Sequence, residues 1–164
     1  MRSQPPRSVP EATRRLVEDM IHEAARAIDD DRLEEFPSFF TEDGVYEVAS
    51  RFNVERGLPL AQINCIGRAM IVDRIESLRH ANVFQPHRYR HLITGIHLAA
   101  GADHALSARS NFMIVRIMDE GSSSLFATGE YRDDIAIDGG AALFRKRQAI
   151  FDSRSIDTLL VIPI

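Results

Sequence analysis

The chain is poor in cysteine: Cys65 is the only one among 164 residues. A single cysteine excludes a disulfide within the chain and suits a reducing compartment, so we expect a cytoplasmic protein. It also argues against a thiolate zinc site or an iron–sulfur cluster built by this chain alone. Such sites need several cysteines, or cysteines and histidines at tight spacing. Chemistry of that kind would have to come from another polypeptide.

The chain also lacks a basic excess and a long apolar run. Its formal net charge is −4, which argues against nucleic acid as a partner. No apolar run approaches the roughly 20 residues that span a membrane. Arg2 and Arg7 precede no apolar segment, so we do not expect a secretory signal. The length fits one domain with a real core, and we expect a flexible arm over residues 1–11 and a single domain over 12–164.

The spacing of apolar residues predicts helices first and strands afterwards. Helical periodicity covers 12–29 and 66–82, and a short irregular helix follows Asp31. A turn at Glu42-Asp43-Gly44 leads to a strand at Val45–Val48, and 50–65 is predicted to be a loop. Four extended segments follow, near 88–99, 104–118, 124–137 and 142–154, separated by turns such as Asp138-Gly139-Gly140. This order predicts an α+β fold in which a strongly curved antiparallel sheet wraps around the N-terminal helices as a cone.

One predicted strand concentrates aromatic, basic and imidazole side chains. With a period of two, Tyr89, His91 and His97 share one face and Arg90 lies on the other. His91 and His97 are six residues apart, about 20 Å along a strand at roughly 3.3 Å per residue, so they cannot share a metal ion. We therefore expect no metal site here, and hydrogen-bonded histidines within the cone or at a subunit contact.

The acidic run Asp29-Asp30-Asp31 leaves two interpretations open. The favoured one is that these residues end the first helix. In the other, an aspartate faces the cone and forms a general acid–base pair with a histidine. Asp30, Asp31 and His91 would then be the catalytic residues of a stand-alone dehydratase or isomerase.

Basic residues and an apolar tail are the candidates for subunit contacts. Arginines and a lysine at 88, 90 and 145–147 can pair with Glu130, Asp133 and Asp134 on neighbouring strands, or contact a partner. The apolar tail over 159–164 can cover its own core or lie against a sister subunit. The interface candidates are Arg88, Tyr89, Arg90, His91, Arg145, Arg147, Leu160 and Ile162.

Several motifs, in order along nearly the whole chain after residue 12, carry a family resemblance. They are Phe39-Phe40-Thr41-Glu42-Asp43-Gly44-Val45-Tyr46, Asp73-Arg74-Ile75, Arg88-Tyr89-Arg90-His91-Leu92-Ile93, Gly129-Glu130-Tyr131-Arg132-Asp133, Arg145-Lys146-Arg147-Gln148-Ala149-Ile150 and Asp157-Thr158-Leu159. With these motifs the chain resembles the small (beta) subunits of Rieske non-haem iron aromatic-ring-hydroxylating dioxygenases, which have the NTF2-like, SnoaL-like cone fold. The stretches around His87–Ile93 and Asp157–Ile164 are most similar to partners of enzymes for carboxylated aromatics such as terephthalate, anthranilate or salicylate.

The resemblance implies a structural subunit within a larger enzyme. A large alpha subunit would hold the [2Fe–2S] Rieske cluster and the mononuclear Fe(II), and an NADH-dependent reductase would supply electrons to it. The implied assembly has three alpha and three beta subunits, with contacts between sister beta subunits. The resemblance assigns no catalytic, cofactor-binding or metal-binding residues to this chain, and no membrane or nucleic-acid partner.

Overall fold

The computed structural model describes residues 8–80, 84–101, 105–156 and 160–164. Most of the predicted arm lies outside these residues, and the first helix begins at Glu11. The elements in chain order are α1 (Glu11–Asp29), η1 (Leu33–Phe39, a 3-10 helix), β1 (Phe40–Ser50), α2 (Arg51–Glu55), β2 (Ile63–Ile66), α3 (Arg68–His80), β3 (His87–Ala100), β4 (Leu106–Met118), β5 (Ser123–Asp138) and β6 (Ala141–Phe151).

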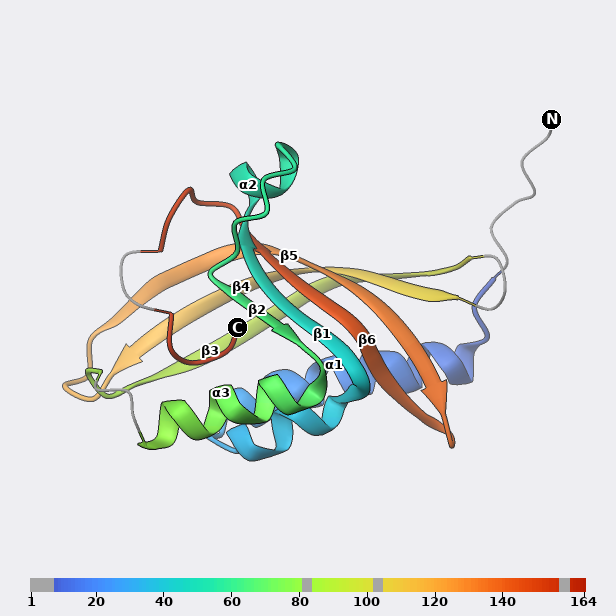
Figure 1. Ribbon diagram of the computed structural model, residues 1–164, viewed down its shortest axis with the longest axis horizontal. Coiled ribbons are helices and arrows are strands. Elements are labelled where there is room, and N and C mark those ends of the chain that lie inside the picture. Colours follow the sequence, from blue (N-terminus) through green and yellow to red (C-terminus); the bar gives the residue numbers. More distant parts are fainter. Residues whose placement is uncertain (1–7, 81–83, 102–104, 157–159) are drawn as a thin grey trace.

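The strands form one sheet in the order β2-β1-β6-β5-β4-β3. Figure 1 shows the long bent strands, with α1 and α3 packed on the same side of the sheet. These features confirm the predicted α+β fold with its curved sheet. One pair differs from the expected antiparallel arrangement, because β1 runs parallel to β6. No hairpin joins these two strands; β2, α3 and the β3–β5 strands lie between them in the chain.

The core lies between the helices and the inner face of the sheet. Strand β4 alternates buried and exposed residues from Leu106 to Ile114, as expected for a strand with one covered face. Helix α1 buries residues three and four apart, including Val17, Ile21 and Ala24. Phe36 and Phe40 pack their rings edge-on at 5.3 Å, which joins η1 to β1.

Two local predictions are wrong. Glu42-Asp43-Gly44 is not a turn; it lies within β1, at a register shift between Phe40 and Val45. Gly44 suits this bulge because a Cβ there would lie 2.9 Å from both the Cβ of Phe40 and the carbonyl oxygen of Thr41. The predicted loop over 50–65 contains α2 and β2, and the Ser50 hydroxyl caps α2 by accepting the Asn53 N–H at 3.2 Å.

The apolar tail docks within its own chain. Leu160, Val161, Ile162 and Ile164 are all buried. The Tyr46 hydroxyl donates to the Ile164 carbonyl oxygen and accepts the Ile164 N–H, both at 2.9 Å. The tail therefore closes this chain's own core, which is one of the two expected positions; Leu159 lies outside the described residues. Across the described ranges, no helix is long and apolar enough to cross a membrane.

Candidate functional site

A buried aspartate–histidine pair joins the end of α1 to β3. The Asp29 Oδ1 accepts the His91 Nδ1–H at 2.6 Å, and the Asp29 Oδ2 accepts the His91 main-chain N–H at 3.0 Å. The His91 side chain is 0 % exposed. Asp29 thus satisfies a main-chain N–H of the edge strand β3 and also fixes the orientation of the imidazole.

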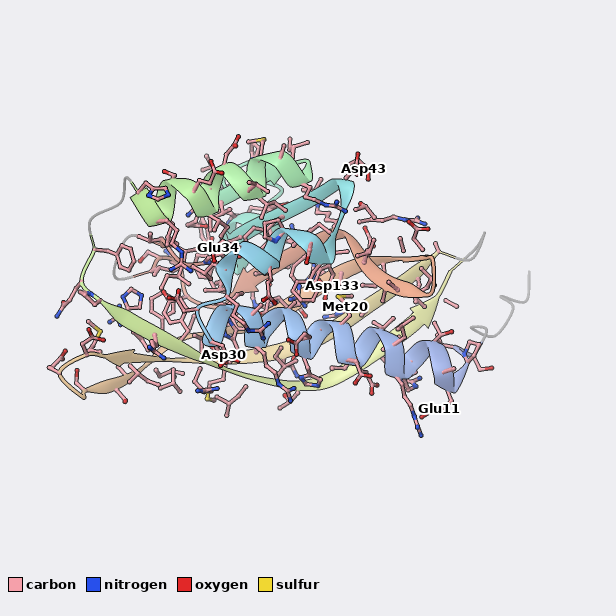
Figure 2. All side chains as sticks on the ribbon, turned by 90° about the horizontal axis from the view of Figure 1, so that it is seen from below. Glu11, Met20, Asp30, Glu34, Asp43 and Asp133 are labelled. Carbon is pink, nitrogen blue, oxygen red and sulfur yellow. The ribbon has the colours of Figure 1, made fainter. Side chains whose placement is uncertain are left out.

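The other two aspartates of the run do not reach His91. Asp31 has a positive φ of 60° and pairs with Arg79 Nη1 at 2.8 Å. Asp30 is exposed and lies 3.8 Å from Arg32; Figure 2 labels it just beyond the end of α1. The acid that contacts His91 is therefore Asp29, not Asp30 or Asp31.

The dyad can orient a proton acceptor, but it lies deep in the core. With Nδ1 donating to Asp29, the neutral His91 ring carries its lone pair on Nε2. Among the described residues, this Nε2 is buried without a hydrogen-bond partner. A general base must come within hydrogen-bond reach of its substrate, and His91 does not line the cavity next to Asp29.

That cavity has a volume of about 300 Å³ and lies where α1, η1, α3, the start of β3 and the tail meet. Its apolar lining includes Leu33, Leu78 and Tyr89, and its polar lining includes Asp29 and Arg79. Arg79 donates to Glu34 at 2.7 Å, and these hydrogen bonds lower the pKa of the Glu34 carboxyl. The cavity is thus a concave space that is lined by both apolar and polar side chains.

A second buried ion pair lies under the helices between β5 and β6. Arg147 donates from Nε and Nη2 to the two Asp133 oxygens at 3.0 and 2.9 Å. The guanidinium also lies 4.1 Å from the ring centroids of Tyr131 and Phe144. Although burial opposes its charge, the Asp133 carboxylate raises the pKa of Arg147. Figure 2 labels Asp133 near the middle of the molecule, and the pair joins β5 to β6 with both side chains buried.

The eight interface candidates divide into two groups. The structure buries five of them within this chain's own core: Tyr89, Arg147, Leu160, Ile162 and the side chain of His91. The other three, Arg88, Arg90 and Arg145, are exposed. Only the exposed three offer a surface to a partner without refolding.

Two surface features of the outer sheet face were missed by the sequence reasoning. Leu92 and Met113 are cross-strand neighbours that are 46 % and 43 % exposed, and Leu125 lies on the next strand at 60 %. Beside them Glu130 pairs with Arg109 and Arg132, and these arginines lower its pKa against the opposing effect of burial. Strand periodicity predicts that each of these side chains points outward. It does not predict the register between strands that places them next to one another.

The described residues hold no group of three or more His, Cys, Asp or Glu side chains arranged to bind a metal ion. Cys65 is free and buried, and burial raises the pKa of its thiol.

Comparisons with known proteins give a consistent result. The family model of the SnoaL-like domain matches residues 12–148. The small subunit of anthranilate 1,2-dioxygenase from Burkholderia cepacia is 35 % identical over 137 residues, which cover 84 % of this chain and 85 % of the relative. The beta 2 subunit of the terminal oxygenase component of terephthalate 1,2-dioxygenase from Comamonas sp. is 37 % identical over 140 residues, covering 85 % and 91 %.

Comparison with solved structures leads to the same family as comparison with sequences. A crystal structure described as the beta subunit of an aromatic-ring-hydroxylating dioxygenase from Novosphingobium aromaticivorans has a TM-score of 0.85 and 32 % identity, covering 94 % of this chain and 98 % of that one. A naphthalene 1,2-dioxygenase structure has a TM-score of 0.76 at 17 % identity, covering 96 % and 88 %. At that identity the second likeness concerns the fold alone.

Proposed function

This chain belongs to the SnoaL-like family and, within it, to the small (beta) subunits of aromatic-ring-hydroxylating dioxygenases, and we propose that it is the assembly subunit of such an enzyme. Its role is to hold a large alpha subunit in a fixed arrangement in the cytoplasm, with three copies of each subunit. The substrate class we propose is a carboxylated aromatic compound, as in the names of the anthranilate and terephthalate relatives.

The observation that carries this proposal is the extent of the match. Two named dioxygenase small subunits align over 84 % and 85 % of the chain at 35 % and 37 % identity. The SnoaL-like family model matches residues 12–148, a range that contains both the Arg147–Asp133 pair and the Asp29–His91 contact. A resemblance of the fold alone would not carry a function.

The redox groups are assigned to the alpha subunit because this chain lacks their ligands. A Rieske cluster needs two cysteines and two histidines, and this chain has one cysteine. We infer that the alpha subunit holds the [2Fe–2S] cluster and the mononuclear Fe(II), and that an NADH-dependent reductase supplies its electrons. This chain then contributes geometry, because electron transfer between subunits needs centres held at fixed distances.

Exposed residues supply the surface for assembly. Arg88, Arg90 and Arg145 offer charged contacts, and Leu92 and Met113 offer an apolar one on the outer sheet face. An apolar patch with a polar border is the usual composition of a protein interface.

Co-expression with the large subunit tests the proposal. We expect the two chains to elute together as a complex that is brown from its iron–sulfur cluster and that oxygenates an aromatic acid when a reductase is present. This chain expressed alone should be colourless and should not turn over the substrate. Failure to associate with any iron-containing large subunit would contradict the proposal.

The Asp29–His91 contact favours a second candidate, a lyase or isomerase that works alone. Under this alternative, replacing His91 by Ala abolishes turnover of a small substrate by the isolated chain. Under the assembly role, the same change lowers stability and weakens the complex, because Asp29 loses its partner. His97→Ala is the matched control, since His97 is an exposed histidine of the same strand.

A further inference from the structure

The cavity beside Asp29 has an aromatic wall. The rings of Phe84 and His87 lie 5.6 Å apart at 73°, and those of His87 and Tyr89 lie 5.1 Å apart at 51°. All three residues line the cavity. The aliphatic lining comes from α1, η1, α3 and the tail, through Ile28, Leu33, Leu78 and Ile162. An apolar cavity of about 150 Å³ already admits benzene, so about 300 Å³ holds one ring with a substituent.

The charged side chains of the lining give the cavity no excess of positive charge. Arg79 is paired with Asp31 at 2.8 Å and with Glu34 at 2.7 Å. The positive charge of Arg88 is offset in the total charge of the lining by the negative charge of Asp119. Asp29 binds His91, and the exposed Arg90 lies 3.8 Å from its Oδ2 but outside the lining, so at this point the lining itself contributes one negative charge. A carboxylate ligand in this cavity would lie near the buried Asp29 carboxylate, which disfavours it there.

Asp29 still has capacity to accept a hydrogen bond. Each carboxylate oxygen has two lone pairs. Within the described part of the chain, the Oδ2 of Asp29 accepts one hydrogen bond, from the His91 main chain, and Arg90 approaches it only to 3.8 Å. Asp29 is buried and lines the cavity. A ligand hydroxyl or amine can donate a second hydrogen bond to this oxygen.

We propose that this cavity is a binding site for one small neutral aromatic molecule that carries a hydroxyl or amine donor. The ring lies against Phe84, His87 and Tyr89, and the donor binds the Asp29 carboxylate. This class is neutral, whereas the aromatic acid assigned to the alpha subunit is an anion. That contrast rests on the proposed function, whereas the binding site itself does not.

Three probes of one ring and one substituent test the proposal on the full chain alone: phenol, toluene and benzoate. Their affinities are measured by ligand-observed NMR titration. We expect phenol to bind about tenfold more tightly than toluene, because a hydrogen bond to a charged acceptor is worth roughly 1.5 kcal/mol or more. Benzoate should bind most weakly. Equal or tighter binding of toluene or benzoate, or no saturable binding of phenol, overturns the proposal.

Variants locate the site. Leu78→Phe fills the cavity and should remove phenol binding, whereas Leu125→Ala on the outer sheet face should leave it unchanged. Phe84→Ala removes part of the aromatic wall without crowding the core and should weaken binding several-fold; thermal unfolding checks that each variant is folded. Phenol binding that survives both Leu78→Phe and Phe84→Ala would place the ligand elsewhere. Because no alpha subunit is present, failure here is distinct from failure of the subunit proposal.

Discussion

At the residue scale, Arg147 is a charged residue that is almost completely buried, with only 1 % of its surface exposed. Removing the Arg147 charge leaves the buried Asp133 carboxylate without its partner. Breaking a buried ion pair in this way lowers stability by about 3–5 kcal/mol. We expect Arg147→Met to lower the free energy of unfolding by that amount, as measured by urea denaturation.

Two further variants show whether the loss of stability in Arg147→Met arises from the unpaired Asp133 carboxylate. The double variant Asp133→Leu/Arg147→Met should recover most of the lost stability, because no unpaired charge remains. Arg145→Met, an exposed position on the same strand, should change stability by less than about 0.5 kcal/mol. A loss as large in the double variant as in Arg147→Met would mean that packing dominates.

Cys65 should be a poor nucleophile in the folded chain. Burial raises the pKa of its thiol, so the reactive thiolate is scarce at neutral pH, and the sulfur is shielded. We expect a thiol reagent to label the native chain at least about a hundredfold more slowly than the chain in guanidinium. With one cysteine in the sequence, the signal has a single source. Fast labelling at full stoichiometry would show that β2 and the tail open readily.

At the element scale, Arg79 joins α3 to η1. Its hydrogen bonds lower the pKa of Glu34, so the stabilisation is complete above the ordinary glutamate pKa, near 4.3. It is lost as the pH falls through the lower value of the folded state. Arg79→Ala should therefore cost up to about 1 kcal/mol at pH 7, with the difference shrinking toward pH 3.5. Thermal unfolding of both proteins across this range measures it; a pH-independent difference would exclude the ion pair as its cause.

The tail depends on one hydroxyl. Tyr46→Phe leaves the Ile164 N–H and carbonyl without their hydrogen bonds in a buried place, and each unsatisfied buried group costs about 1–3 kcal/mol. We expect a loss of at least about 1 kcal/mol in urea denaturation and faster proteolysis of the tail. An unchanged cleavage rate would show that apolar burial alone holds the tail.

Elements with regular periodicity could be predicted from the sequence, and long-range geometry could not. The α1 helix and the β3–β6 strands follow from apolar spacing, because each has one covered face. The bulge at Gly44 looks like a turn, since glycine suits both and only the neighbouring β6 decides between them. The choice of Asp29 over Asp30 and Asp31 depends on where the last turn of α1 points relative to β3, which no local pattern contains.

At the scale of the whole molecule, the inner face of the sheet is covered by the chain's own core, whereas the outer face is exposed to solvent. Helices α1 and α3, η1 and the tail cover one side of the sheet (Figure 1), whereas Leu92, Met113 and Leu125 remain exposed on the other. Helices α1 and α3 lie on the opposite side of the sheet and cannot cover this patch; Arg51 of α2 lies at its border. Such a surface fits a protein whose work is done in a complex.

Replacing Met113 by Asp tests this use of the outer face. Met113 is 43 % exposed, so the change should alter the stability of the isolated chain by less than about 0.5 kcal/mol. In an assembled enzyme the same carboxylate would be desolvated, and we expect at least about a tenfold loss of affinity. Sizing of the co-expressed complex measures it. Ile137→Asp is the matched control, since Ile137 is 47 % exposed near the far end of β5, away from the patch. Equal loss of complex in both variants would mean that the patch does not define the interface.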